Sequence, residues 1–147
     1  MPVATVAEHI AAPADRVWDH INWHGVERLT GGLFQRIEFF GDTPEPGVTK
    51  RLHFAEGLPV LERLEWVDEG DRSYRYRVID CGSLPVTDYA GYVRVTPCGP
   101  DACFLKIESE FTPVLVTAKE WSATWCAMEV SLIDQIRALV VAPVSAG

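Results

Sequence analysis

A carboxylate lies on the apolar face of a predicted strand near the middle of the chain. Within residues 60–67, Glu62 has the same parity as Leu64 and Trp66. Alternate residues of a strand point to one face of a sheet, so we expect all three to point inward. A dry pocket raises the pKa of a carboxyl, which suits a general acid or base near neutral pH. Glu62 is therefore predicted to handle protons; the alternative is a structural ion pair.

The preceding predicted strand carries a lysine on its apolar face. Lys50 shares its parity with Leu52 and Phe54. A buried lysine is costly unless it has a partner or a lowered pKa. Since Glu62 is on the next strand, the pair is predicted to act as an acid and base or to bind a carboxylate. The alternative is a lysine at the sheet edge whose ammonium reaches solvent.

Tyrosines follow the same alternation on two later strands. Tyr74, Tyr76 and Val78 share one face, and Tyr89 shares a face with Gly91. A tyrosine in a cavity offers an apolar ring with a polar tip, so Tyr76 and Tyr89 are predicted to orient substrate oxygens. Gly91 is predicted to leave room for a ligand. The alternative is that the tyrosines pack in the core with their hydroxyls bound to the backbone.

Histidines and cysteines do not form a convincing metal pattern. His20 and His24 have helical spacing, but Gly25 interrupts the helix and a third ligand is missing. Cys98 and Cys103 flank a predicted hairpin turn, and free thiols are expected there rather than a disulfide. No metal and no other cofactor is predicted.

Composition limits the classes of partner. The chain has 147 residues and a net charge of −8, with 48% hydrophobic residues. An acidic protein lacks the clustered Lys and Arg that nucleic acids require, and it is repelled by anionic membranes. There is no apolar run of membrane-spanning length and no secretory signal pattern, so we expect no membrane insertion and a cytoplasmic location.

Turn chemistry divides the chain into one strand, two short helices, six more strands and a long helix. The expected segments are 2–10, 14–21, 22–32, 33–40, 47–55, 60–67, 72–80, 87–96, 102–112 and 117–141. No repeat or linker separates them, so residues 1–147 are predicted to form a single domain. The order favours an α+β fold in which a curved antiparallel β-sheet of about seven strands wraps around the long C-terminal helix and encloses a hydrophobic cavity.

The last helix carries an aromatic stripe. Its apolar residues recur at spacings of three and four: Trp121, Trp125, Met128, Leu132 and Ile136. Thr117 and Glu120 have the spacing of a capping box. Trp121, Trp125 and Met128 are predicted to form a cavity wall, and Glu129 lies at the border of the stripe as a candidate ligand contact.

Several local motifs accompany this order of elements. They are the Ile10–Trp18 junction, Gly47-x-x-Lys-Arg51, Glu62-Arg-Leu64, Ser73-Tyr-x-Tyr76 and Leu84-Pro-Val-x-x-Tyr89. Together they resemble the START/Bet v 1-like (SRPBCC) superfamily and, within it, the polyketide cyclase/dehydrase and lipid-transport family. The resemblance implies the helix-grip fold with an internal ligand cavity.

One loop is similar to the gate loop of the plant abscisic acid receptors, which belong to the same superfamily. Gly57-Leu58-Pro59 matches their Gly-Leu-Pro, whereas the His-Arg-Leu of their latch is absent near Leu84. This similarity implies a mobile loop at the cavity mouth, with Leu58 and Pro59 touching the ligand. It would also turn Glu108 inward, whereas the alternation, which we follow, turns it outward.

Two classes of function follow, together with a third that involves no ligand. The resemblance and the inward polar residues favour a cofactor-independent, polyketide cyclase/dehydrase-like enzyme of natural-product biosynthesis. It would cyclise, dehydrate or isomerise a small hydrophobic or aromatic substrate. The second is a carrier or sensor for such a molecule, and the third is an interaction module with a collapsed core. A homodimer is left open.

Overall fold

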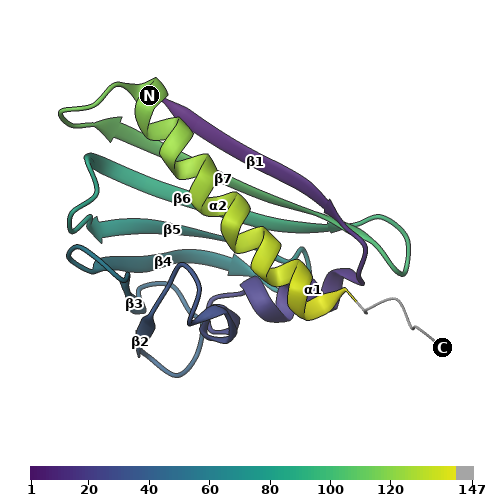
Figure 1. Ribbon diagram of the computed structural model, residues 1–147. Coiled ribbons are helices and arrows are strands. Elements are labelled where there is room, and N and C mark those ends of the chain that lie inside the picture. The colour runs from purple at the N-terminus through teal and green to yellow at the C-terminus, as the bar shows by residue number, and fades with distance from the viewer. Residues whose placement is uncertain (142–147) are drawn as a thin grey trace.

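Seven strands form a single antiparallel sheet in the computed structural model, which describes residues 1–141. The elements are β1 (Val3–Ile10), α1 (Ala14–Ile21), the 3₁₀ helix η1 (Gly25–Leu29), β2 (Arg36–Phe40), β3 (Thr49–His53), β4 (Val60–Asp68), β5 (Ser73–Asp80), β6 (Val86–Pro97), β7 (Cys103–Pro113) and α2 (Ala118–Val140). The sheet order is β1-β7-β6-β5-β4-β3-β2, so strands β2 to β7 form a meander and β1 closes its far edge (Figure 1). The predicted α+β architecture is confirmed.

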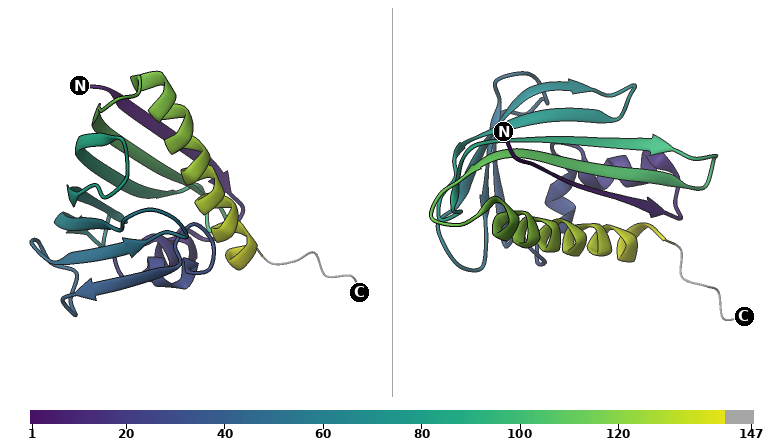
Figure 2. Two further views of the ribbon diagram at one scale, coloured as in Figure 1. Left: turned by 60° about the vertical axis from the view of Figure 1, so that its left-hand side comes forward. Right: turned by 90° about the horizontal axis from the view of Figure 1, so that it is seen from above.

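The sheet curves around α2, which crosses its concave side (Figure 2). The helix packs on β1 and β7 and reaches α1 and η1 near its C-terminal end. Its start is fixed by the predicted capping box: the Glu120 backbone N–H donates to the Thr117 hydroxyl, and the Thr117 N–H donates to the Glu120 carboxylate, both at 3.0 Å. Among residues 1–141, no helix is both long and apolar enough to span a bilayer.

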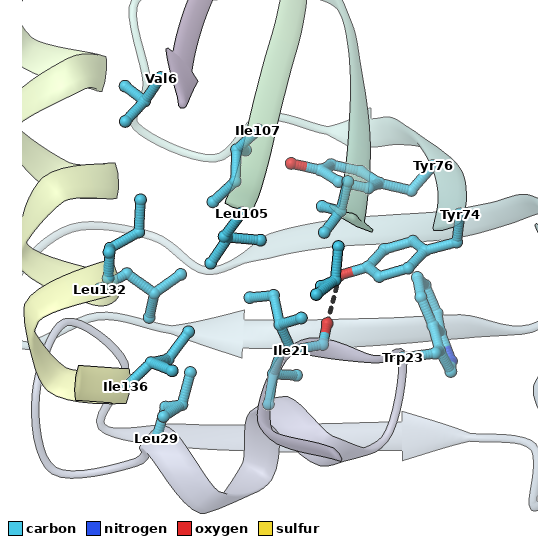
Figure 3. Close-up of a cluster of buried hydrophobic side chains, with 14 of the residues drawn as sticks. Val6, Ile21, Trp23, Leu29, Tyr74, Tyr76, Leu105, Ile107, Leu132 and Ile136 are labelled. Atoms are coloured by element: carbon cyan, nitrogen blue, oxygen red, sulfur yellow. Dashed lines mark hydrogen bonds between the residues drawn. The ribbon is translucent and has the colours of Figure 1, made fainter. Parts of the chain in front are cut away.

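The interior is filled by apolar side chains from the sheet, α2 and the α1–η1 segment. Figure 3 shows this cluster, including Ile21, Leu29, Leu105, Ile107, Leu132 and Ile136. All six are almost fully buried. Burial of this kind supplies most of the stability of such a fold and fixes the position of the cavity beside it.

The second predicted helix is shorter than expected. Instead of residues 22–32, only Gly25–Leu29 is helical, and its geometry is 3₁₀. The backbone at Asn22 is extended, which ends α1, and the Asn22 side chain accepts a hydrogen bond from the Gly25 N–H at 2.7 Å. This local bond competes with continued helix.

A β-bulge in β4 reverses the predicted orientation of one site residue. Leu64 pairs with Tyr76, but Trp66 pairs with Arg75, so one extra residue is inserted between them. Trp66 consequently lies on the outer face against Tyr92 and is 39% exposed. Its predicted inward orientation is wrong, whereas the next residue, Val67, packs against the core.

Candidate functional site

A cavity lies between the inner face of the sheet, α2 and the segment that follows α1. It holds about 640 Å³ of space, part of it open to solvent. Its wall includes six of the predicted polar residues: Lys50, Glu62, Tyr74, Tyr76, Tyr89 and Glu129. It also includes the predicted apolar residues Leu52, Phe54, Val78 and Met128.

Lys50 and Glu62 face each other across neighbouring strands. They are direct cross-strand partners in the β3–β4 pairing, and the Lys50 Nζ lies 3.9 Å from Glu62 Oε1. Lys50 is 2% exposed and Glu62 8%. The ammonium also donates to the Trp23 backbone carbonyl at 3.1 Å and lies 4.0 Å from the centre of a Trp23 ring. The inward lysine is thus held on three sides.

Burial moves the pKa values of this pair toward each other. Loss of hydration lowers the pKa of Lys50 to about 8, although the Glu62 charge opposes the shift. Burial likewise raises the pKa of Glu62 to about 7, against the opposing effect of Lys50. Both pKa values therefore lie closer to neutral pH than those of an ordinary lysine and an ordinary glutamate.

Glu129 enters the cavity from the opposite wall, on α2. It is 9% exposed, and within residues 1–141 its carboxylate forms neither a hydrogen bond nor an ion pair. Burial, with a smaller contribution from the Glu62 charge, raises the pKa of Glu129 to about 8. The sequence pattern placed Glu129 only at the border of the apolar stripe of the last helix. In the structure it lines the same cavity as Lys50 and Glu62.

The three tyrosines form a row of neutral hydroxyls. The Tyr74 hydroxyl donates to the Ile21 carbonyl at 2.9 Å (dashed in Figure 3), and the Trp125 indole N–H donates to the Tyr89 hydroxyl at 2.9 Å. Burial, reinforced by nearby charged or ionisable groups, holds the pKa values of Tyr74, Tyr76 and Tyr89 well above their ordinary range. These side chains therefore stay neutral and do not act as phenolates, and the Tyr74 proton is already donated to Ile21.

Gly91 makes room for a protein side chain rather than for a ligand. A Cβ at this position would overlap the Cζ atom of the Tyr76 ring. Gly91 is not part of the cavity wall. The prediction that Gly91 leaves space for a ligand is therefore wrong. The missing side chain of Gly91 makes room for the ring of Tyr76, which extends from β5 across the neighbouring strand β6.

The two tryptophans of α2 lie behind the cavity wall. Trp121 packs edge-on against Tyr89, with ring centres 6.4 Å apart, and Trp125 is hydrogen-bonded to the same tyrosine. Both are almost fully buried, but Tyr89 separates them from the cavity space. They support a wall residue, whereas they were predicted to be the wall.

Three further predicted contacts also lie outside the cavity lining. Leu64 is fully buried in the core, whereas Leu58 is 64% exposed and Pro59 is half-buried. The Leu58 N–H donates to the Ser83 hydroxyl at 2.8 Å, so the 57–59 loop is held against the 81–85 turn, whose Leu84 lines the cavity. Its mobility stays a prediction.

Sequence reasoning missed the contribution of the segment before β2. Val26, Leu33 and Phe34 line the cavity, together with Ile21 at the end of α1. The apolar Leu33-Phe34 pair directly after two glycines is the signal that could have located them. It was assigned to a strand, whereas β2 begins only at Arg36.

The remaining candidates take structural roles. Glu108 is on the outer face, 3.2 Å from the Lys106 ammonium, as the alternation predicts. His20 and His24 hydrogen-bond to the backbone carbonyls of Arg16 and Gly41. All four cysteines are free thiols.

Comparisons with known proteins agree with this architecture. The family described as polyketide cyclase / dehydrase and lipid transport matches residues 1–130. S-norcoclaurine synthase from Thalictrum flavum subsp. glaucum is 31% identical over 111 residues, which cover 69% of this chain and 52% of that protein. S-norcoclaurine synthase 2 from Coptis japonica is 30% identical over 112 residues, 69% of this chain and 57% of that protein. The chain spans about half the length of these curated relatives.

Solved structures show the same fold. Truncated norcoclaurine synthase from Thalictrum flavum superposes with a TM-score of 0.72 at 25% identity, covering 96% of this chain and 94% of the other. The protein XoxI from Bacillus cereus gives a TM-score of 0.82 at 20% identity, with 96% of each chain covered, and supports the fold alone. The resemblance found in the motifs is confirmed, and the chain belongs to the polyketide cyclase / dehydrase and lipid transport family of the Bet v 1-like (SRPBCC) superfamily.

Proposed function

We propose that this protein is an enzyme that moves protons on a small hydrophobic or aromatic molecule held in the cavity. The observation that carries the proposal is a set of three buried ionisable side chains, Lys50, Glu62 and Glu129, that face one largely apolar space. Burying such groups is expensive, and a protein that only holds an apolar ligand gains nothing from them. Groups with pKa values between about 7 and 8 are suited to acid and base catalysis near neutral pH.

Each group has a role that follows from its position. Glu62 gives and takes the proton, and Lys50 controls the charge of Glu62 from 3.9 Å away. Tyr76 and Tyr89 donate hydrogen bonds to substrate oxygens, which polarises a carbonyl and fixes its orientation. The apolar wall holds the rest of the molecule and excludes water. Cyclisation, dehydration and isomerisation all need this combination of orientation and proton transfer.

The relatives support an aromatic substrate. A norcoclaurine synthase from Thalictrum flavum, which superposes with a TM-score of 0.70 at 25% identity, has been solved in complex with dopamine and hydroxybenzaldehyde. Those are one-ring molecules, and a single ring also fits within the roughly 640 Å³ of the present cavity. We propose a substrate of similar size, in the type of chemistry found in natural-product biosynthesis.

Exchange of carbon-bound protons tests the proposal without knowledge of the natural substrate. Phenylacetone in D₂O is the probe, and NMR follows the loss of its α-protons. The wild-type protein should accelerate the exchange, and Glu62→Gln should reduce that acceleration by about 100-fold. Glu65→Gln is the matched control, because Glu65 is on the same strand but pairs with Arg75 and Arg77 on the outer face. Full activity in Glu62→Gln, or none in the wild type, would refute the assignment.

The second candidate function is a carrier or sensor for the same class of molecule. The observation in its favour is that the wall is apolar apart from the six polar side chains. A carrier would bind phenylacetone, seen as line broadening of the ligand in NMR, but would leave its α-protons in place in the wild type and in both variants.

A further inference from the structure

The surroundings of the Lys50 Nζ stabilise a positive charge on this nitrogen. They do so equally whether the lysine is a free ammonium or is covalently attached to a ligand. The Nζ lies 4.0 Å from the centre of a Trp23 ring, 5.8 Å from that of Tyr74 and 3.9 Å from Glu62 Oε1. Aromatic faces and a carboxylate stabilise any positive charge at this point. A protonated Schiff base keeps its charge on the same nitrogen, so all three contacts would persist after a carbonyl compound has condensed with the lysine.

We propose that Lys50 is a nucleophile that forms a Schiff base with a small aldehyde or ketone bound in the cavity. Lys50 lines the cavity, and its partner acid, Glu62, lines it too. The inference rests on the proposed function only in that a carbonyl compound must enter the same space. It goes beyond that function because it adds a covalent step to proton transfer.

The condensation is complete with the groups present. The free amine of Lys50 attacks the carbonyl carbon and forms a C–N bond, and a proton passes from the nitrogen to the oxygen to give a neutral carbinolamine. Protonated Glu62 then gives its proton to the hydroxyl, which leaves as water while the nitrogen lone pair forms the C=N bond. The products are a protonated Schiff base, a Glu62 carboxylate beside it and one water, so no oxidant or reductant is needed.

The protonation states required for this step coexist in a narrow pH range. Burial lowers the pKa of Lys50 to about 8, so about half of it is free amine at pH 8, whereas an ordinary lysine is less than about 1% free amine there. The titratable groups facing this site are Glu62 from β4, Tyr74 and Tyr76 from β5, Tyr89 from β6 and Glu129 from α2. The tyrosines stay neutral, so the carboxyls set the local charge.

Reductive trapping tests the inference, because the chain has only three lysines. The protein is treated at pH 8 with benzaldehyde and sodium cyanoborohydride, and the benzylated positions are mapped by peptide mass spectrometry. Lys106, whose side chain is 46% exposed, and exposed Lys119 serve as internal controls within the same molecule. We expect Lys50 to be benzylated about 10-fold faster than either. Benzyl alcohol, which fits the same space but cannot condense, should slow the reaction at Lys50 alone.

Two variants distinguish acid catalysis by Glu62 from simple access of the aldehyde to Lys50. Glu62→Gln should slow trapping at Lys50 about 10-fold, because the amide cannot protonate the leaving hydroxyl. Glu65→Gln, which alters only the outer face of β4, should react like the wild type. Labelling at Lys106 and Lys119 should be equal in all three proteins, which also controls for reagent quality.

Two results would overturn the inference, and they differ in what they say about the proposed function. If Lys50 is labelled no faster than the surface lysines while Glu62-dependent exchange of phenylacetone persists, the nucleophile is wrong and the acid–base function stands. If neither trapping nor exchange occurs, both fail. Equal trapping rates in wild type and Glu62→Gln would remove Glu62 from the condensation and contradict the step as written.

Discussion

The two faces of β3 carry two ion pairs with the same separation and opposite electrostatic behaviour. On the inner face, Lys50 lies 3.9 Å from Glu62; on the outer face, the next residue, Arg51, lies 3.9 Å from Glu38. The pKa of Glu62 is raised to about 7, mainly by burial. The pKa of Glu38 is lowered, mainly by a hydrogen bond of 2.6 Å from His53.

Access to water, not ionic distance, explains the difference. The side chain of Glu62 is 10% exposed, and that of Glu38 is 34% exposed. Solvent and several donors satisfy the outer carboxylate, so its charged form is favoured. The inner carboxylate has a single cation and an apolar surround, so its charged form is barely preferred at neutral pH. One strand therefore separates a conventional surface pair from a buried pair whose pKa values lie near neutral pH.

Removal of Lys50, the cation of the inner pair, should have the largest effect on stability. At pH 8, Lys50→Met should lower the free energy of unfolding by about 3–5 kcal/mol, because it leaves the Glu62 charge buried without a partner. At pH 5.5 the loss should shrink, since Glu62 then holds its proton. Urea denaturation at the two pH values measures both.

Arg51→Met is the matched variant, one residue away on the outer face. It should cost less than about 1 kcal/mol, as expected for a largely solvated pair. Equal losses for the two variants at pH 8 would show that the inner pair is not distinct.

Glu129→Gln should give the next largest effect, with the opposite sign. Because the folded state raises the pKa of Glu129 from 4.5 to about 8, the folded protein binds this proton more tightly than the unfolded chain does. Its contribution to stability is therefore full below about pH 4.5 and is lost as the pH rises to about 8. Glutamine carries no charge at any pH, so the variant should match the wild type near pH 5.

At pH 8.5, Glu129→Gln should be more stable than the wild type by about 4 kcal/mol. Thermal unfolding at pH 5 and pH 8.5 checks this, with Glu108→Gln on the outer face of β7 as control. A wild type that is more stable than the Glu129 variant at pH 8.5 would show that this carboxylate has a partner.

Trp66→Ala should have the smallest effect on stability. It tests the β4 bulge that turns this side chain to the outer face. A ring that is 39% exposed on the outer face should cost about 1 kcal/mol of stability and leave benzyl alcohol binding unchanged. An inward ring would cost about 3–5 kcal/mol instead. Denaturant unfolding and ligand-observed NMR distinguish the two orientations.

The order of elements predicted the fold, and strict alternation placed the charged pair inside. Alternation failed where the strands are irregular. Lys50 and Glu62 lie in regular stretches, so parity placed both on the inner face. Trp66 follows a bulge, and no feature of its own segment marks the extra residue. The resemblance to known families could not correct this, because its motif ends at Leu64.

The rest of the site depends on packing between elements far apart in the chain. Glu129 shares the cavity with Glu62 only because α2 crosses the curved sheet at that point. Trp125 lies behind Tyr89 rather than beside the ligand space, which helical spacing cannot predict. Helical periodicity identifies the buried face of α2 but not which of its turns borders a cavity.

The most direct test is a single titration of ¹³C-labelled glutamate carboxyls by NMR, with signals assigned by the Glu62→Gln, Glu129→Gln and Glu38→Gln variants. The account predicts that Glu62 and Glu129 titrate near pH 7 and 8, while Glu38 titrates below its usual range. If Glu62 and Glu129 instead lose their protons near the ordinary glutamate value of about 4.3, the inner carboxyls are not poised for proton transfer, and the central claim is wrong.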